Sequence, residues 1–106
     1  MTTKPFANRL GYTDVEPFEV VRVISDRTVE VRRMAATLAA DWRPEMHAGG
    51  FSAHCVNNRD QRWTITSDET APVLRIRVRK DGDWYAATGE RFRMADAPRK
   101  FHDYNF

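Results

Sequence analysis

The sequence predicts a mainly β protein: a small antiparallel β-barrel or sandwich with at most one short helix. Three observations support this prediction. Short β-branched or alternating segments recur along the chain, turn-forming residues separate them, and one stretch alone favours a helix. An SH3-like barrel is the form that we expect first. The length of 106 residues suits a single domain that spans 1–106.

The first part of the chain is expected to contain one hairpin and one helix-friendly stretch. Residues 1–16 are polar and are expected to be irregular. A β-branched run over 18–24 and an alternating run over 28–34 are predicted to pair through the turn at 25–27. Residues 35–42 are alanine-rich and form at most two helical turns, which need tertiary support because so short a helix is unstable alone.

Two further strands are predicted after a glycine pair. Residues 51–56 indicate a strand, 57–60 a turn, and 62–66 the next strand. Side chains alternate between the two faces of a strand, so Trp63 and Ile65 are expected on the same face.

The clearest signal is a three-stranded meander over 73–94. Aliphatic residues alternate strictly with arginines over 74–79. The Asp-Gly pair at 81–82 is typical of a two-residue hairpin turn, which sets Trp84 opposite Arg79. The predicted sheet then has one apolar face, with Tyr85, Phe92 and Met94, and one arginine face. The arginine face is predicted to consist of Arg75, Arg77, Arg79, Trp84, Arg91 and Arg93.

The arginine face is the candidate partner-binding surface. Alternate residues of a strand lie about 6.7 Å apart, a spacing comparable to that of phosphates along a nucleic-acid strand, and an exposed Trp84 would stack on a base. Guanidinium groups bind carboxylates equally well, so the same face would also suit an acidic protein surface. A third interpretation is a solvated outer face, as is usual in antiparallel sheets, with Trp84 covered by Arg79.

Catalytic and metal-binding constellations are weakly indicated. The soft metal ligands of the chain are His47, His54, Cys55 and His102. They lack the paired short spacing of zinc sites, so no metal is expected. Cys55 shares strand parity with Phe51 and Ala53, which predicts a buried core cysteine; a small enzyme using Cys55 with a histidine base is kept as an alternative. No glycine-rich phosphate loop is present, so no cofactor is expected.

Composition limits the remaining classes. The formal net charge is only +2, and 17 basic residues face 15 acidic ones. The basic residues are arginines apart from Lys4, Lys80 and Lys100, which suits carboxylate or phosphate partners. The single cysteine precludes an internal disulfide. The N-terminus lacks the features of a signal peptide and no run is long enough to span a membrane, so a cytoplasmic protein with no membrane partner is expected.

The C-terminal segment 97–106 is unusually aromatic, with Phe101, Tyr104 and Phe106. We expect this tail to dock on the domain or on a partner. Together with the segment Glu-Pro-Phe-Glu-Val-Val at 16–21, it resembles small uncharacterised β-rich proteins of bacteria and their phages and plasmids. The resemblance implies an accessory protein that works by binding, and it brings no activity or site residues with it.

We therefore expect a non-enzymatic binding module that presents the arginine face to an acidic partner. In a mobile-element setting it would be an accessory or inhibitor protein that acts on a host protein or nucleoprotein. A single-stranded nucleic-acid-binding protein is the first alternative, and the small cysteine enzyme is the second.

Overall fold

The computed structural model describes residues 4–49, 52–55 and 57–104. These residues are mainly β, with one 3-10 turn, η1 (Asn58–Asp60), and no α-helix among them. The strands are β1 (Phe6–Leu10), β2 (Val15–Glu16), β3 (Phe18–Ser25), β4 (Thr28–Arg33), β5 (Ala35–Leu38), β6 (Met46–Gly49), β7 (Ser52–Cys55), β8 (Trp63–Thr66), β9 (Val73–Val78), β10 (Trp84–Ala86) and β11 (Arg91–Ala95).

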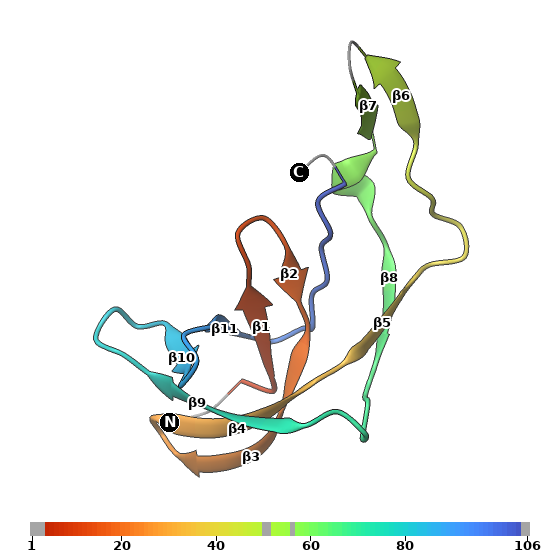
Figure 1. The fold of residues 1–106 in the computed structure, drawn as a ribbon. Coiled ribbons are helices and arrows are strands. Elements are labelled where there is room, and N and C mark those ends of the chain that lie inside the picture. Colours follow the sequence, from red (N-terminus) through yellow and green to blue (C-terminus); the bar gives the residue numbers. More distant parts are fainter. Residues whose placement is uncertain (1–3, 50–51, 56, 105–106) are drawn as a thin grey trace.

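Six strands close into an antiparallel barrel in the order β1-β3-β4-β9-β10-β11, with β11 returning to β1 (Figure 1). The closing seam runs from the pair Phe6–Ala95 to the pair Leu10–Arg91. β2 continues β3 across the buried Pro17 and pairs with the other end of β1. Closure removes the exposed sheet edges that an open sheet would present. The prediction of a small antiparallel β-barrel is confirmed in preference to a sandwich, and its SH3-like form stays a prediction.

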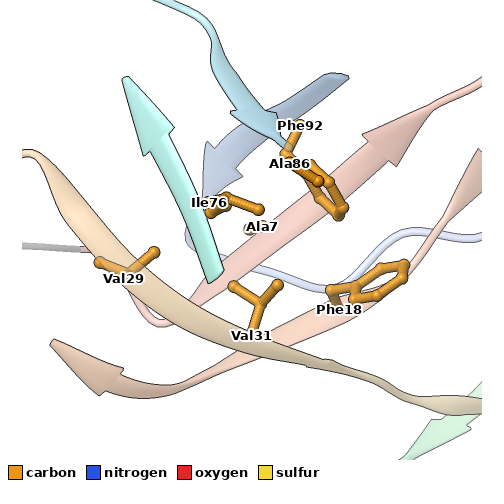
Figure 2. Packing of buried hydrophobic residues seen from close by; sticks show 7 residues of the cluster. All are labelled: Ala7, Phe18, Val29, Val31, Ile76, Ala86 and Phe92. Carbon is orange, nitrogen blue, oxygen red and sulfur yellow. The ribbon is translucent and has the colours of Figure 1, made fainter. Parts of the chain in front are cut away.

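The barrel interior is an apolar core (Figure 2). Its buried members are Ala7, Phe18, Val29, Val31, Ile76, Ala86 and Phe92. The rings of Phe18 and Phe92 meet edge to face, with centroids 5.0 Å apart and an interplanar angle of 90°. This is one of the preferred geometries for an aromatic pair. The predicted alternation over 74–79 is confirmed, because Ile76 is fully buried while the arginines on either side of it are exposed.

The prediction that residues 1–16 are irregular is wrong for β1 and β2. β1 lies between β11 and β3 and completes the barrel, with Ala7 and Asn8 buried. Its sequence has no regular alternation of apolar and polar residues because the C-terminal tail covers part of its outer face. Asn8 donates a hydrogen bond to the carbonyl of Ala97 at 3.2 Å and accepts one from the amide of Arg99 at 2.9 Å.

A two-stranded arm, formed by β5 and β8, projects from the barrel. β5 follows β4 directly after the buried Met34 and pairs with β8 from Ala35–Thr66 to Leu38–Trp63. The β6–β7 hairpin lies at the far end of this arm (Figure 1). The arm accounts for the elongated dimensions of 51 × 29 × 23 Å.

The sequence left open whether the helix-friendly stretch at 35–42 is helical, and the structure shows that it is not, because β5 is a strand and a turn follows it. Alanine favours a helix by only a fraction of a kcal/mol per residue. Two helical turns are too short to be stable alone, whereas the ladder with β8 satisfies the backbone and sets Ala36 beside Ile65.

The other predicted strands are found where the sequence placed them. β3 and β4 form the hairpin expected at 18–34. β7 and β8 occupy the segments 51–56 and 62–66, although residues 51 and 56 lie outside the described part of the chain. β6 was not predicted and pairs with β7.

The C-terminal tail packs on the rest of the chain as far as residue 104. The backbone of Phe101 exchanges two hydrogen bonds with Val15, of 2.9 and 3.0 Å. Beyond it, the ring of Tyr104 lies 5.8 Å from that of buried Trp42 in the loop after β5. Phe106, the last aromatic residue of the predicted tail, lies outside the described residues.

Candidate partner-binding surface

Two three-residue turns set the register of the β9–β10–β11 meander. Across the first, the amide of Arg79 donates to the carbonyl of Asp83 at 2.9 Å, and the turn over 87–89 repeats the arrangement. The third residue of each turn is a glycine with positive φ, +86° at Gly82 and +100° at Gly89. This is the geometry of a type I turn followed by a left-handed residue, a conformation that glycine adopts without steric strain.

The additional turn residue exchanges the two faces of β10. Trp84 pairs with Val78 rather than with Arg79, and Tyr85 pairs with Arg77. A one-residue change of register moves every side chain to the opposite face of the sheet. The prediction that Trp84 lies on the arginine face is therefore wrong. Trp84 packs half-buried against the core, and Tyr85 takes its place beside the arginines.

The second three-residue turn makes an equal shift between β10 and β11, which returns β11 to the faces that the sequence predicts. Phe92 pairs with Trp84, and Arg91 pairs with Tyr85. Phe92 and Met94 pack in or against the core, so their predicted place on the apolar face is confirmed, and it is Tyr85 that leaves that face. The β11 arginines are exposed on the outer surface.

The arginine face of the structure thus keeps all five predicted arginines and gains a tyrosine. It consists of Arg75, Arg77, Arg79, Tyr85, Arg91 and Arg93.

Three of these arginines lie close to carboxylates of the same chain. Arg75 Nη2 is 3.3 Å from Glu30 Oε2, and Arg91 Nη1 and Arg93 Nη2 are 3.6 and 3.7 Å from the two oxygens of Asp83. The three guanidinium side chains are 54%, 47% and 65% exposed. Ion pairs this exposed contribute little to stability, about 0–1 kcal/mol, so they can exchange for an external carboxylate at small cost.

Arg77 and Arg79 form no ion pair with a described carboxylate, although the charge of Arg79 contributes to the lowered pKa of Asp81. The guanidinium carbon of Arg79 lies 4.1 Å from the ring centroid of Tyr85, in a cation–π contact. The Tyr85 hydroxyl donates a 2.6 Å hydrogen bond to Asp81. This bond lowers the pKa of Asp81 and raises the pKa of Tyr85, so the pair remains an ionised carboxylate and a neutral phenol over the physiological pH range.

Two further cations, Arg27 and Lys80, lie near Arg79 and were not predicted from the sequence. Arg27 lies in the β3–β4 turn, where its carbonyl accepts a 3.1 Å hydrogen bond from the amide of Val78. Lys80 opens the β9–β10 turn. Neither makes an ion pair with a described residue. We call Arg27, Arg77, Arg79 and Lys80 the unpaired basic cluster.

A hollow of about 1080 Å³ lies between these two turns. It is lined by Asp26, Arg27, Val78, Arg79, Lys80, Asp81 and Trp84. We call this hollow the barrel mouth.

Cys55 is 2% exposed, as the sequence predicts for a core cysteine. Its sulfur lies 3.3 Å from Asn57 Oδ1. Nδ1 of His102 lies 3.7 Å from Asp14 Oδ2. No group of three or more His, Cys, Asp or Glu side chains suited to a metal ion occurs within the described residues. The side chains of His47 and His54 lie outside the described part of the structure.

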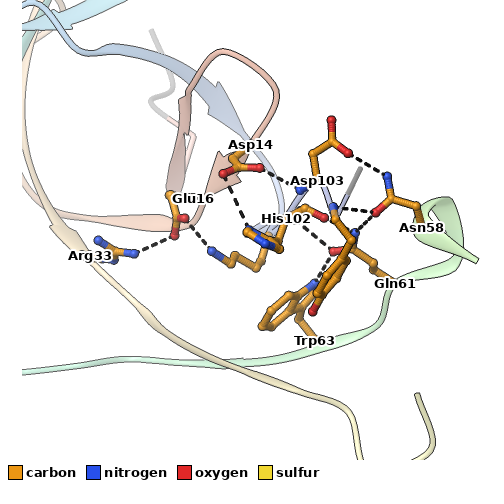
Figure 3. A network of polar contacts seen from close by, with 10 residues as sticks. Asp14, Glu16, Arg33, Asn58, Gln61, Trp63, His102 and Asp103 are labelled. Atoms are coloured by element: carbon orange, nitrogen blue, oxygen red, sulfur yellow. Dashed lines mark hydrogen bonds and ion pairs between the residues drawn. The ribbon is translucent and has the colours of Figure 1, made fainter. Parts of the chain in front are cut away.

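A network of polar contacts joins the tail to the barrel and the arm (Figure 3). Glu16 is 8% exposed and contacts Arg33 at 2.8 Å and Lys100 at 2.5 Å. The Lys100 ammonium also lies 5.3 Å from the Trp63 ring. Gln61 accepts a 2.9 Å hydrogen bond from the amide of His102 and donates one to its carbonyl. These contacts are structural, because they fix the tail against the arm.

A separate carboxylate gives the fold a predicted pH dependence. Arg32 and the hydroxyl of Ser67 each donate a 2.8 Å hydrogen bond to Glu19. The bond from Arg32 is the main cause of a lowered pKa of Glu19, and it outweighs the opposing effect of burial. The folded protein therefore binds this proton less readily than the unfolded chain. The associated stability is present above the unfolded pKa of about 4.3 and is lost as the pH falls through the lower folded pKa.

We accordingly expect Glu19→Gln to destabilise the protein near neutral pH and to cost less as the solution becomes acidic. The free energy of unfolding, measured by urea titration from about pH 6 to pH 3, should show the gap between wild type and variant narrowing. Glu69→Gln, in the exposed 67–72 loop, is the control and should not reproduce this pattern. A gap that stays constant over the range would contradict the role assigned to Glu19.

Comparison of the chain with protein-family models, with curated proteins and with solved structures found no match. Its fold defines it as a closed six-stranded antiparallel barrel with a projecting two-stranded arm. Within the described residues, no helix has the length and apolar character needed to cross a membrane.

Proposed function

We propose that the protein is a non-enzymatic binding module whose arginine face docks on an acidic protein surface. The observation that carries the proposal is that Arg77 and Arg79 are exposed and form no ion pair with a described residue. Arginine presents a planar fork of donors that matches carboxylate geometry, and a barrel strand holds neighbouring forks at fixed spacing. In the mobile-element setting that the resemblance implies, the module would be a cytoplasmic accessory or inhibitor of a host protein.

An acidic protein is favoured over single-stranded nucleic acid because the arginine face lacks a free aromatic platform. Base stacking supplies about 1–3 kcal/mol per base in single-strand binders. Trp84 is turned toward the core, and Tyr85 is covered by Arg79 and tied to Asp81 through its hydroxyl. The arginine face therefore offers guanidinium groups without a free aromatic ring, and carboxylates are suitable partners for guanidinium groups.

The proposal predicts that Arg77→Ser/Arg79→Ser weakens binding to poly-L-glutamate at least about tenfold at low salt. Tenfold corresponds to about 1.4 kcal/mol, which two charge-assisted hydrogen bonds readily supply. Binding would be measured by fluorescence anisotropy of the labelled polymer at about 50 mM salt, where screening is modest. The urea midpoint of the variant should stay near that of wild type, because both side chains are exposed.

Arg59→Ser/Arg62→Ser is the matched control, since it removes two exposed arginines from the region of the arm. It should leave the affinity for poly-L-glutamate nearly unchanged. Equal losses in both double variants would indicate nonspecific attraction and would reject the arginine face as the site. Tighter binding to an oligothymidylate, with a salt slope reduced by about 1.4 in Arg77→Ser/Arg79→Ser, would favour the nucleic-acid alternative instead.

A further inference from the structure

The barrel mouth combines an apolar floor with a charged rim. Val78 and Trp84 are opposite each other in the β9–β10 ladder; Trp84 packs against the core, and Val78 shares the strand face of buried Ile76. Trp84 is half-buried, so part of its surface remains open to the hollow that it lines. Both hairpin turns that border the hollow lie at the same end of the barrel (Figure 1). Concave sites that bind small groups are mostly apolar with a few placed polar groups, and they commonly occupy about 300–1,000 Å³.

The rim carries three cations and two carboxylates. Arg27, Arg79 and Lys80 line it from the two turns, together with Asp26 and Asp81. Asp81 already accepts hydrogen bonds from the Tyr85 hydroxyl and from the amide of residue 83. Arg27, Arg79 and Lys80 form no ion pair with a described residue, and three cations against two carboxylates leave the rim with one net positive charge.

We infer that the barrel mouth is a specificity pocket for an aromatic side chain flanked by carboxylates in the acidic partner. This inference rests on the proposed function and identifies which acidic sequence the partner presents. The aromatic ring would contact Trp84 and Val78, and the flanking carboxylates would pair with Arg27 and Lys80. Aromatic pairs and buried apolar surface both favour such an insertion. Arg79 borders both the pocket and the arginine face, so one acidic segment can occupy both.

The test compares two probes that differ only in aromatic content: poly-L-glutamate and a random copolymer of glutamate and tyrosine. We expect wild-type protein to bind the copolymer about tenfold more tightly per polymer at matched length, because a ring is buried in addition to the charge pairing. In Trp84→Leu the preference should fall to about twofold or less. Arg27→Ser/Lys80→Ser, whose side chains are exposed in turns, should reduce the preference without requiring any change in the core.

A spectroscopic measurement locates the contact independently. The indole N–H signal of Trp84, assigned by its absence in Trp84→Leu, should shift on titration with the copolymer and not with poly-L-glutamate. A preference for the copolymer that survives both variants, or equal affinity of wild type for the two polymers, would overturn the pocket while leaving the proposed function intact. Failure of wild type to bind either polymer would overturn both. Tighter binding of free adenosine monophosphate than of the copolymer would assign the pocket to a nucleotide and reject the peptide segment.

Discussion

Phe92→Ala is expected to lower the free energy of unfolding by about 3–5 kcal/mol, the usual cost of removing a buried phenyl ring. Phe92 is fully buried on β11, one of the two strands that close the barrel. Its ring packs edge to face against Phe18, and it faces Trp84 across the ladder. A domain of this size has a total stability of about 5–15 kcal/mol, so the variant should lose between about one fifth and all of its stability.

Urea unfolding followed by circular dichroism measures this effect. Val73→Ala is the control, because Val73 is 50% exposed on β9 and its truncation should cost about 0.5 kcal/mol or less. An unchanged urea midpoint for Phe92→Ala would mean that the core described around Phe92 is wrong.

The fold class and most of the strands could be predicted because alternation is a local signal. The run over 74–79 determines which residues of β9 point inward, and a hairpin joins segments that are adjacent in the chain. β1 could not be predicted in this way. It is stabilised by contacts with β11 and with the tail, about ninety residues away, and its own pattern is disturbed because Asn8 is buried under that tail.

The composition of the candidate site depended on a single turn residue. An Asp-Gly pair fits the two central positions of a two-residue turn, and it also fits the last two positions of a three-residue turn. The second interpretation has a signal in the sequence: both turns place glycine third, at Gly82 and Gly89. It also puts the larger apolar ring of Trp84 on the face of Ile76 and leaves the hydroxyl of Tyr85 outside. The five arginines lie on the same face with either turn length, because apolar residues and arginines alternate within β9 and within β11. Trp84 and Tyr85 of β10 exchange faces when the turn gains a residue.

The unpaired basic cluster could not be predicted because it depends on which charges are neutralised. The sequence predicts five arginines on one face and does not indicate which of them lie beside a carboxylate. In the folded chain Glu30 lies beside Arg75, and Asp83 lies beside the two β11 arginines, so the uncompensated charge moves toward the β9–β10 turn. Arg27 joins it because β4 pairs with β9, a tertiary contact between distant segments.

Glu16→Leu is expected to destabilise the protein by about 3–5 kcal/mol, because it leaves a buried ammonium group without its carboxylate. The side chains of Glu16 and Lys100 are 11% and 13% exposed, and the contact between them is 2.5 Å. The other partner, Arg33, is 53% exposed and can return to water, so Arg33→Ala should cost much less, about 1 kcal/mol. The measured quantity is the free energy of unfolding in urea.

Lys100→Met in the Glu16→Leu background should recover most of the lost stability, because an apolar pair of similar volume does not carry the desolvation cost of an ion pair. Such a recovery would show that the stability lost in Glu16→Leu comes from the unpaired charge of Lys100 and not from a packing defect. Purely additive losses in the double variant would contradict the assignment. Because Lys100 is held by Glu16 and lies against Trp63 of the arm, Glu16→Leu should also loosen the tail, and limited proteolysis near residue 99 should become faster than in wild type. In the compensated double variant the cleavage rate should return toward that of wild type, since Phe101 still pairs with Val15 through the backbone.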